Sequence, residues 1–178
     1  MAVSTESTST STSEELARFR LWLAEKIEAS LPDKVKLERA NPQTIKLIKD
    51  RYDLAKQRAR VQIPPEQEPQ FLDDLLDEIL GFGPLEKILG DDAVTEVMVN
   101  RADLIYVEKK GKLTEADIQF NDDAHVERVI RKIIEPLGRV IDRDSPMVDA
   151  RLPDGSRVNA VIPPCAIDGP NITIRKFS

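Results

Sequence analysis

The sequence predicts an α+β fold: an N-terminal helical segment followed by a mostly antiparallel sheet domain with packed helices. Up to residue 92, apolar side chains recur every three or four positions, as they do on one face of a helix. From residue 93 the period changes to two, as in strands, with one more helical stripe over 121–137. Helices followed by hairpins and one intervening helix are typical of an α+β domain, not of alternating βα units.

The composition excludes several classes of protein. The formal net charge of -6 argues against a surface that neutralises nucleic-acid phosphates, so we expect no nucleic-acid partner. Cys165 is the only cysteine, which excludes an internal disulfide bond, and with His125 as the only histidine it cannot form a Cys/His zinc site. The sequence shows neither a membrane-spanning apolar run nor a signal peptide, so we expect a soluble protein of a reducing compartment.

Four segments are predicted along the chain. Residues 1–13, rich in Ser and Thr, should form a disordered tail. Residues 14–61 should form a pair of helices, and residues 62–69, which contain three prolines, an extended linker. Residues 70–178 should form the α+β domain.

The helical pair has recognisable ends and an unusual charge. Ser13 followed by two glutamates predicts the start of the first helix, and Asn41 before Pro42 predicts that of the second. Residues 14–61 contain 12 Lys or Arg and 8 Asp or Glu, inside an acidic protein. Such a pair can dock on an anionic membrane surface or an acidic partner, and an ordinary solvated face with interspersed ion pairs explains the same charges.

The α+β domain is predicted to open with a helix that Gly81 ends and a further helical turn over 84–89. A later helix should be capped by Asn121 or Asp122. The predicted strands are Val94–Asn100, Leu104–Glu108, Leu113–Phe120, Met147–Leu152, Arg157–Ile162 and Asn171–Phe177.

The segment Leu-Pro-Asp-Gly-Ser at 152–156 is the strongest turn signal in the chain. It predicts a three-residue hairpin loop closed between its first and last residues. That register gathers the apolar residues of both strands on one face, whereas a two-residue turn would mix the faces. It also places Arg151 directly opposite Arg157 on the polar face, with Asp149 nearby.

Two arginines that face each other across strands repel, and one carboxylate does not neutralise both. Since the planar guanidinium fork matches phosphate oxygens, the hairpin is a candidate anion site. Arg175 points to the polar face of its own strand, so three arginines converge if that strand lies beside the hairpin. The alternative is that these arginines pair with surface carboxylates such as Asp142, Asp144 or Asp149.

Five blocks in this order carry a family resemblance: GFGPLEKIL, VTEVMVN, IYVEKKGKL, SPMVDARLPDGSRVNAVIPP and DGPNITIRKFS. Over about residues 71–178 the sequence resembles the PAS-like N-terminal domain of secretion traffic ATPases, most closely the CpaF type of tight-adherence (type IVc) pili within the type II/type IV superfamily. The resemblance implies a homohexameric ring in which ATP binds between this domain and a C-terminal RecA-like motor domain. It also implies an inner-membrane platform protein as partner and a cytoplasmic place at the inner membrane.

In that family, arginines of the N-terminal domain reach the ATP phosphates. By motif, Arg157 in GSRVN and Arg175 in ITIRKF are the matching residues, and Arg151 in DARLP is a third candidate.

The chain has no G-x-x-x-x-G-K-[ST] motif and no Walker B strand, so we expect no catalytic residues and no ATP hydrolysis from it alone. ATP and Mg²⁺ would be bound by a full-length protein of which this chain is a fragment, unless it is a short paralogue, and we expect no cofactor to bind tightly to this chain alone. The alternative function is a non-catalytic protein-interaction module.

Overall fold

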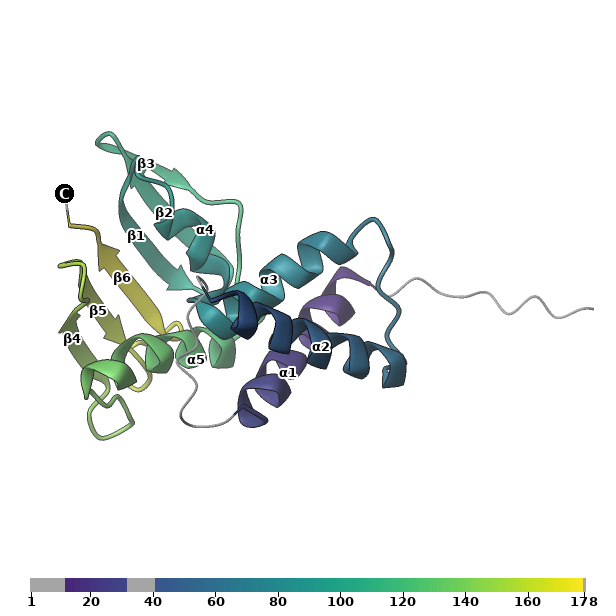
Figure 1. Ribbon diagram of the computed structural model, residues 1–178. Coiled ribbons are helices and arrows are strands. Elements are labelled where there is room, and N and C mark those ends of the chain that lie inside the picture. Colours follow the sequence, from purple (N-terminus) through teal and green to yellow (C-terminus); the bar gives the residue numbers. More distant parts are fainter. Residues whose placement is uncertain (1–11, 32–40, 178) are drawn as a thin grey trace, which may run out of the picture. The chain divides into compact units, whose positions relative to one another are not determined.

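The computed structural model describes residues 12–31 and 41–177, which form two compact units that divide after Gly81 (Figure 1). The predicted disordered tail lies outside the described residues except at its last two positions. In these described parts of the chain, no helix is long and apolar enough to cross a bilayer.

The first unit consists of the helices α1 (Ser13–Ala29), α2 (Pro42–Arg58) and α3 (Glu68–Leu80). The predicted pair of helices is confirmed, and α1 begins at Ser13, with Thr12 as the residue that caps it. The Thr12 hydroxyl oxygen accepts a hydrogen bond from the Glu15 backbone N–H at 3.2 Å, and the Glu15 carboxylate accepts one from the Thr12 N–H at 2.9 Å. Such a reciprocal pair satisfies two backbone donors that the helix itself leaves free.

The third helix, α3, belongs to the helical unit and not to the α+β domain, which was predicted to begin at residue 70. Its apolar face packs with those of α1 and α2 in one core, where Leu75 is fully buried. The Phe71 ring stacks on that of Phe19 with centroids 6.0 Å apart, and Asp74 pairs with Arg20 at 3.3 Å. The apolar stripe of α3 was evident in the sequence, but such a pattern does not indicate whether the helix packs against other helices or against the sheet.

The segment 62–69 is not a free linker. Ile63 is buried in the helical core, and Glu68 is the first residue of α3. The Glu68 carboxylate accepts a hydrogen bond from the Tyr52 hydroxyl at 3.0 Å and forms an ion pair with Lys56. Residues 62–67 are not helical, but the burial of Ile63 and the polar contacts of Glu68 attach this segment to the helical unit. Like α3, this segment belongs to the helical unit, which ends at Gly81.

The second unit is an antiparallel six-stranded sheet with helices, which confirms the predicted α+β class. The strand order is β3-β2-β1-β6-β5-β4. The elements are η1 (Gly83–Leu85), α4 (Glu86–Leu89), β1 (Val94–Arg101), β2 (Leu104–Lys109), β3 (Lys112–Glu115), α5 (Asp123–Ile134), η2 (Glu135–Leu137), β4 (Met147–Arg151), β5 (Arg157–Val161) and β6 (Asn171–Arg175).

One face of the sheet packs against α5, and the opposite face is polar. Alternate residues of the strands, including Val97, Val158 and Ile174, are buried with the apolar stripe of α5 in one core. Because side chains alternate across a strand, the residues between them point to the other face. Strand β3 is shorter than predicted and ends at Glu115. The chain then leaves the sheet and brings Phe120 into the core.

Candidate anion-binding site

The hairpin of β4 and β5 has the register that the hydrophobic pattern predicts. Arg151 pairs with Arg157 across the strands. The Leu152 N–H donates to the Ser156 carbonyl at 2.8 Å, and the Gly155 N–H donates to the Leu152 carbonyl at 2.9 Å. Gly155 has a φ of +89°, in the region that favours glycine, so the turn requires this residue at this position. The short loop thereby fixes two arginines opposite each other.

Strand β6 adds the third arginine. Its register on β5 sets Arg175 directly opposite Arg157, so Arg151, Arg157 and Arg175 form one line across three strands, which we call the arginine row. Val158 and Ile174, the neighbours of Arg157 and Arg175 along the chain, are 2% and 1% exposed. The arginines therefore point to the polar face, and all three are exposed. The structure brings together the three residues that sequence analysis had singled out.

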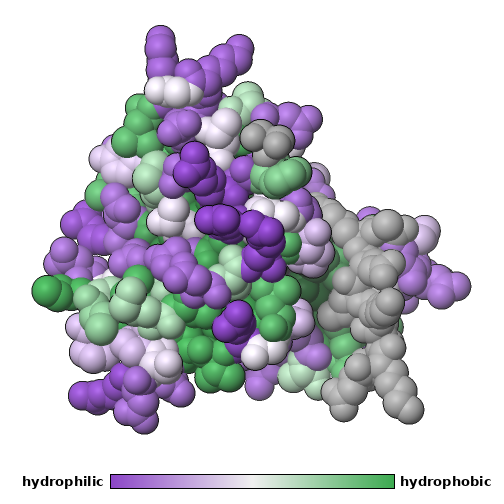
Figure 2. All heavy atoms as spheres, turned by 90° about the vertical axis from the view of Figure 1, so that its left-hand side faces the viewer, coloured by the Kyte–Doolittle hydropathy of each residue, from purple (hydrophilic) through white to green (hydrophobic). Residues whose placement is uncertain are grey.

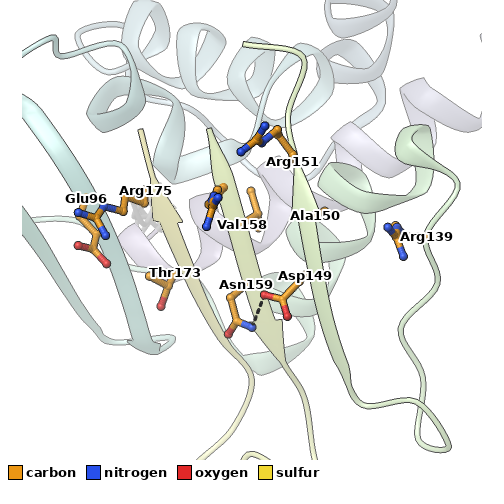
Figure 3. Close-up of a pocket in the computed structure, with 10 residues that line it drawn as sticks. Glu96, Arg139, Asp149, Ala150, Arg151, Val158, Asn159, Thr173 and Arg175 are labelled. Carbon is orange, nitrogen blue, oxygen red and sulfur yellow. Dashed lines mark hydrogen bonds between the residues drawn. The ribbon is translucent and has the colours of Figure 1, made fainter. Parts of the chain in front are cut away.

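Two of the carboxylates that the sequence offered as partners for these arginines form hydrogen bonds elsewhere. Asp149 accepts a hydrogen bond from the Asn159 side-chain amide at 3.0 Å (Figure 3). Asp142 accepts the backbone N–H groups of Asp144 and Ser145 at 3.0 and 2.7 Å, which shapes its own loop. Within residues 12–31 and 41–177, no carboxylate forms an ion pair with a guanidinium of the arginine row. Its charge is thus available to an external anion.

The arginine row lines an open concavity of about 620 Å³. Figure 2 views the molecule from the side where the sheet lies in Figure 1, and hydrophilic side chains gather through the middle of that view. Arg139, from the loop after η2, also lines the concavity and lies beyond β4 in Figure 3. The sequence did not indicate Arg139, because a loop residue has no periodicity that shows the direction of its side chain. The other lining residues are Glu96, Asp149, Ala150, Val158, Asn159 and Thr173.

The line of arginines continues into acidic residues on the next two strands. Glu96 of β1 is the cross-strand partner of Arg175, and Glu108 of β2 is the partner of Glu96. Along one line the charge therefore changes from three positive to two negative. Since like charges repel and opposite charges attract, an anion is favoured at the β4–β5 end and disfavoured near β1.

The end of β6 is fixed beside the hairpin loop. The Phe177 N–H donates to the Ser156 hydroxyl at 3.3 Å. The Lys176 ammonium group donates to the carbonyl oxygens of Leu89 and Asp91, each at 2.9 Å. These contacts hold the last described residues close to the arginine row.

A sheet that presents unpaired arginines on its polar face defines a candidate phosphate-binding domain, and comparison with known proteins gives its family. The family model described as "Type II/IV secretion system protein" matches residues 78–178, which is more than half of the chain. The chain therefore belongs to this family.

The chain is also similar to curated proteins. The chain is 43% identical over 99 residues to the uncharacterized protein MJ0781 of Methanocaldococcus jannaschii, covering 54% of this chain and 14% of that protein. It is 32% identical over 104 residues to the putative conjugal transfer protein Rv3659c of Mycobacterium tuberculosis, covering 55% of this chain and 30% of that protein. The chain thus spans less than a third of the length of either relative.

Among solved structures, the chain is similar to the VirB11 ATPase of the Brucella suis type IV secretion system, crystallised in complex with sulphate. The sequence identity is 30%, and the alignment covers 53% of this chain and 30% of that one with a TM-score of 0.48.

Proposed function

We propose that this chain is the N-terminal part of a CpaF-type ATPase, a homohexamer that powers pilus assembly or protein secretion. In this proposal, Arg157 and Arg175 contact the ATP phosphates, and Arg151 assists them. The observation that carries the proposal is the arginine row, whose guanidinium groups form no ion pair within the described residues and which lies on the exposed face of the sheet.

Guanidinium groups suit this task for a physical reason. During phosphoryl transfer, negative charge redistributes over the phosphate oxygens, and fixed positive charges stabilise that change. Arginine remains charged at every relevant pH and offers two parallel N–H groups to a phosphate. The sheet holds two such groups on neighbouring strands, so little reorganisation is needed when an anion arrives.

The rest of the nucleotide site would come from a motor domain. The chain contains no P-loop sequence, and a P-loop is what binds the β- and γ-phosphates together with Mg²⁺. The arginine row would therefore face ATP from the opposite side, across a domain interface. A motor domain that follows residue 178 would begin next to the row, because Phe177 is attached to the hairpin loop.

The remaining parts of the proposal concern place and partners. The ring would work in the cytoplasm at the inner membrane and transmit its motion to a membrane platform protein. The competing function is that of a non-catalytic interaction module. In that case the arginines would contact no phosphate and would have no role in ATP hydrolysis.

Steady-state ATP hydrolysis distinguishes the two functions in the protein that carries this chain together with its motor domain. We expect Arg157→Ala and Arg175→Ala each to lower turnover at least tenfold, a cautious figure beside the ~10³–10⁵ that an arginine finger contributes. Thermal unfolding should change little, because both side chains point away from the core. The matched control is Arg101→Ala, since Arg101 is also an exposed strand arginine but pairs with Asp103 at 3.0 Å. Near-normal turnover in both variants would end the phosphate-site proposal.

A further inference from the structure

Arg139 reaches the concavity from outside the sheet. It follows η2 and lies beyond β4, the last strand on this side, whereas the arginine row occupies β4, β5 and β6 (Figure 3). Like the row, its guanidinium has no ion-pair partner among the described residues. A fourth unpaired arginine thus borders the same concavity from a different element.

The backbone of Arg139 is anchored. Gly138 ends η2 with a φ of +71°, and the Arg139 N–H donates to the carbonyl of Ile134 at 3.2 Å. Two residues further on, Ile141 is buried in the core of the unit. A side chain that starts from a fixed backbone loses less freedom when it binds a ligand than one on a free loop. The position of Arg139 at the rim of the site is therefore built into the fold.

The charges of the sheet direct an anion toward Arg139. Glu96 and Glu108 continue the row on the β1 side, so a ligand that extended in that direction from Arg175 would meet negative charge. On the β4 side the concavity is bordered by Arg139, and Asp149, the carboxylate on that side, accepts a hydrogen bond from the Asn159 side-chain amide. An elongated anion that contacts Arg157 is hence favoured to extend across β4 and away from β1.

We propose that Arg139 is a fourth binding residue of this site, and that the site takes a chain of linked phosphate groups, not a single phosphate. The inference rests on the proposed function, since it assigns the direction of the phosphates in the same site. Neighbouring strands are about 4.8 Å apart, so the backbones of Arg151 and Arg175 are separated by about 10 Å. With Arg139 the positively charged surface becomes wider still, and a single phosphate is too small to contact all four arginines. The polyphosphate part of a nucleotide matches this width.

The test uses the 178-residue chain and three inorganic probes: phosphate, pyrophosphate and tripolyphosphate. Isothermal titration calorimetry at constant ionic strength gives their dissociation constants. The variants are Arg139→Gln and the control Arg143→Gln. Arg143 is an exposed arginine of the same loop that does not line the concavity, so both variants lose the same net charge. Arg157→Gln reports on the arginine row itself.

We expect tripolyphosphate to bind at least tenfold more tightly than phosphate. Arg139→Gln should weaken tripolyphosphate binding by roughly threefold to tenfold and phosphate binding by less than about twofold, in keeping with the loss of one charge-assisted contact. Arg143→Gln should change neither. The inference is overturned if Arg139→Gln behaves like Arg143→Gln, or if the three probes bind equally. Tight tripolyphosphate binding that Arg157→Gln leaves unchanged would instead overturn the proposed phosphate contacts of the row, and a failure of every probe to bind would overturn both.

Discussion

Arg157 and Arg175 are direct cross-strand partners on β5 and β6, and Arg151 lies opposite Arg157 on its other side. Like charges in directly opposite positions destabilise a sheet. Glu96 lies opposite Arg175 on the far side of β6 and offsets part of this repulsion, whereas both cross-strand neighbours of Arg157 are arginines. An anion bound across the row removes the repulsion, so anion binding and the stability of the sheet are linked.

Replacing the central arginine should therefore stabilise the sheet at low salt. Threonine is well suited to strands, and Arg157→Thr removes two unfavourable pairs at once. We expect the free energy of unfolding of the sheet unit to rise by about 0.2–1 kcal/mol at low ionic strength, and the gain to shrink in ~1 M salt because of screening. Urea unfolding at both salt concentrations measures it, with Arg101→Thr as control. A loss of stability at low salt would show that the row is not under repulsion.

The turn of the hairpin should depend on Gly155. An added Cβ would lie 3.1 Å from the Phe177 ring, and the φ of +89° disfavours any other residue. We expect Gly155→Ala to lower the free energy of unfolding by about 1–3 kcal/mol. Gly111→Ala is the control, since Gly111 has a φ of +74° with nothing within 4 Å of the added Cβ, so its loss reflects the backbone alone. An equal loss in both variants would mean that the Phe177 contact contributes nothing.

The boundary between the units should decide which truncated chains fold. A chain that begins at residue 82 should unfold in one cooperative thermal transition. A chain that begins at residue 70 carries α3 without α1 and α2, so Leu75 and Leu76 become exposed, and we expect aggregation or binding of a hydrophobic dye. Size-exclusion chromatography and thermal melts compare the two. Greater stability and solubility of the chain from residue 70 would contradict the boundary.

Glu68 should make the helical unit sensitive to acid. Hydrogen bonds from Lys56 and then from Tyr52 hold the pKa of the Glu68 carboxyl below its ordinary value of 4.5. A lowered folded-state pKa means that this stabilisation is complete above the unfolded-state pKa and is lost as the pH falls through the folded-state value. Glu68→Gln should therefore flatten the decline in melting temperature below pH 4.5. The exposed Glu66 serves as control through Glu66→Gln, and an unchanged acid profile in Glu68→Gln would contradict the assignment.

The sequence was most informative where a pattern is local. The register of the β4–β5 hairpin followed from hydrophobic alternation and one turn, because a slip of one residue would expose a buried face. The sequence predicted the face on which Arg175 lies but not the strands beside it. The strands β6 and β1 pair across more than 70 residues, and the alternation of apolar residues in a strand does not indicate which strands it pairs with. For the same reason the apolar face of α3 was predicted but assigned to the wrong unit. Arg139 lies on a loop, where no periodicity indicates a direction.

The most direct test of the arginine row is an NMR titration of the 178-residue chain with pyrophosphate. The side-chain Nε–H signals of Arg157 and Arg175 report on the guanidinium groups themselves. If the row binds phosphate groups, these two signals shift and saturate together with one dissociation constant, while the signal of Arg101, which pairs with Asp103, stays in place. No shift at Arg157 and Arg175, or equal and unsaturated shifts at all three arginines, would contradict the existence of a phosphate site on this sheet.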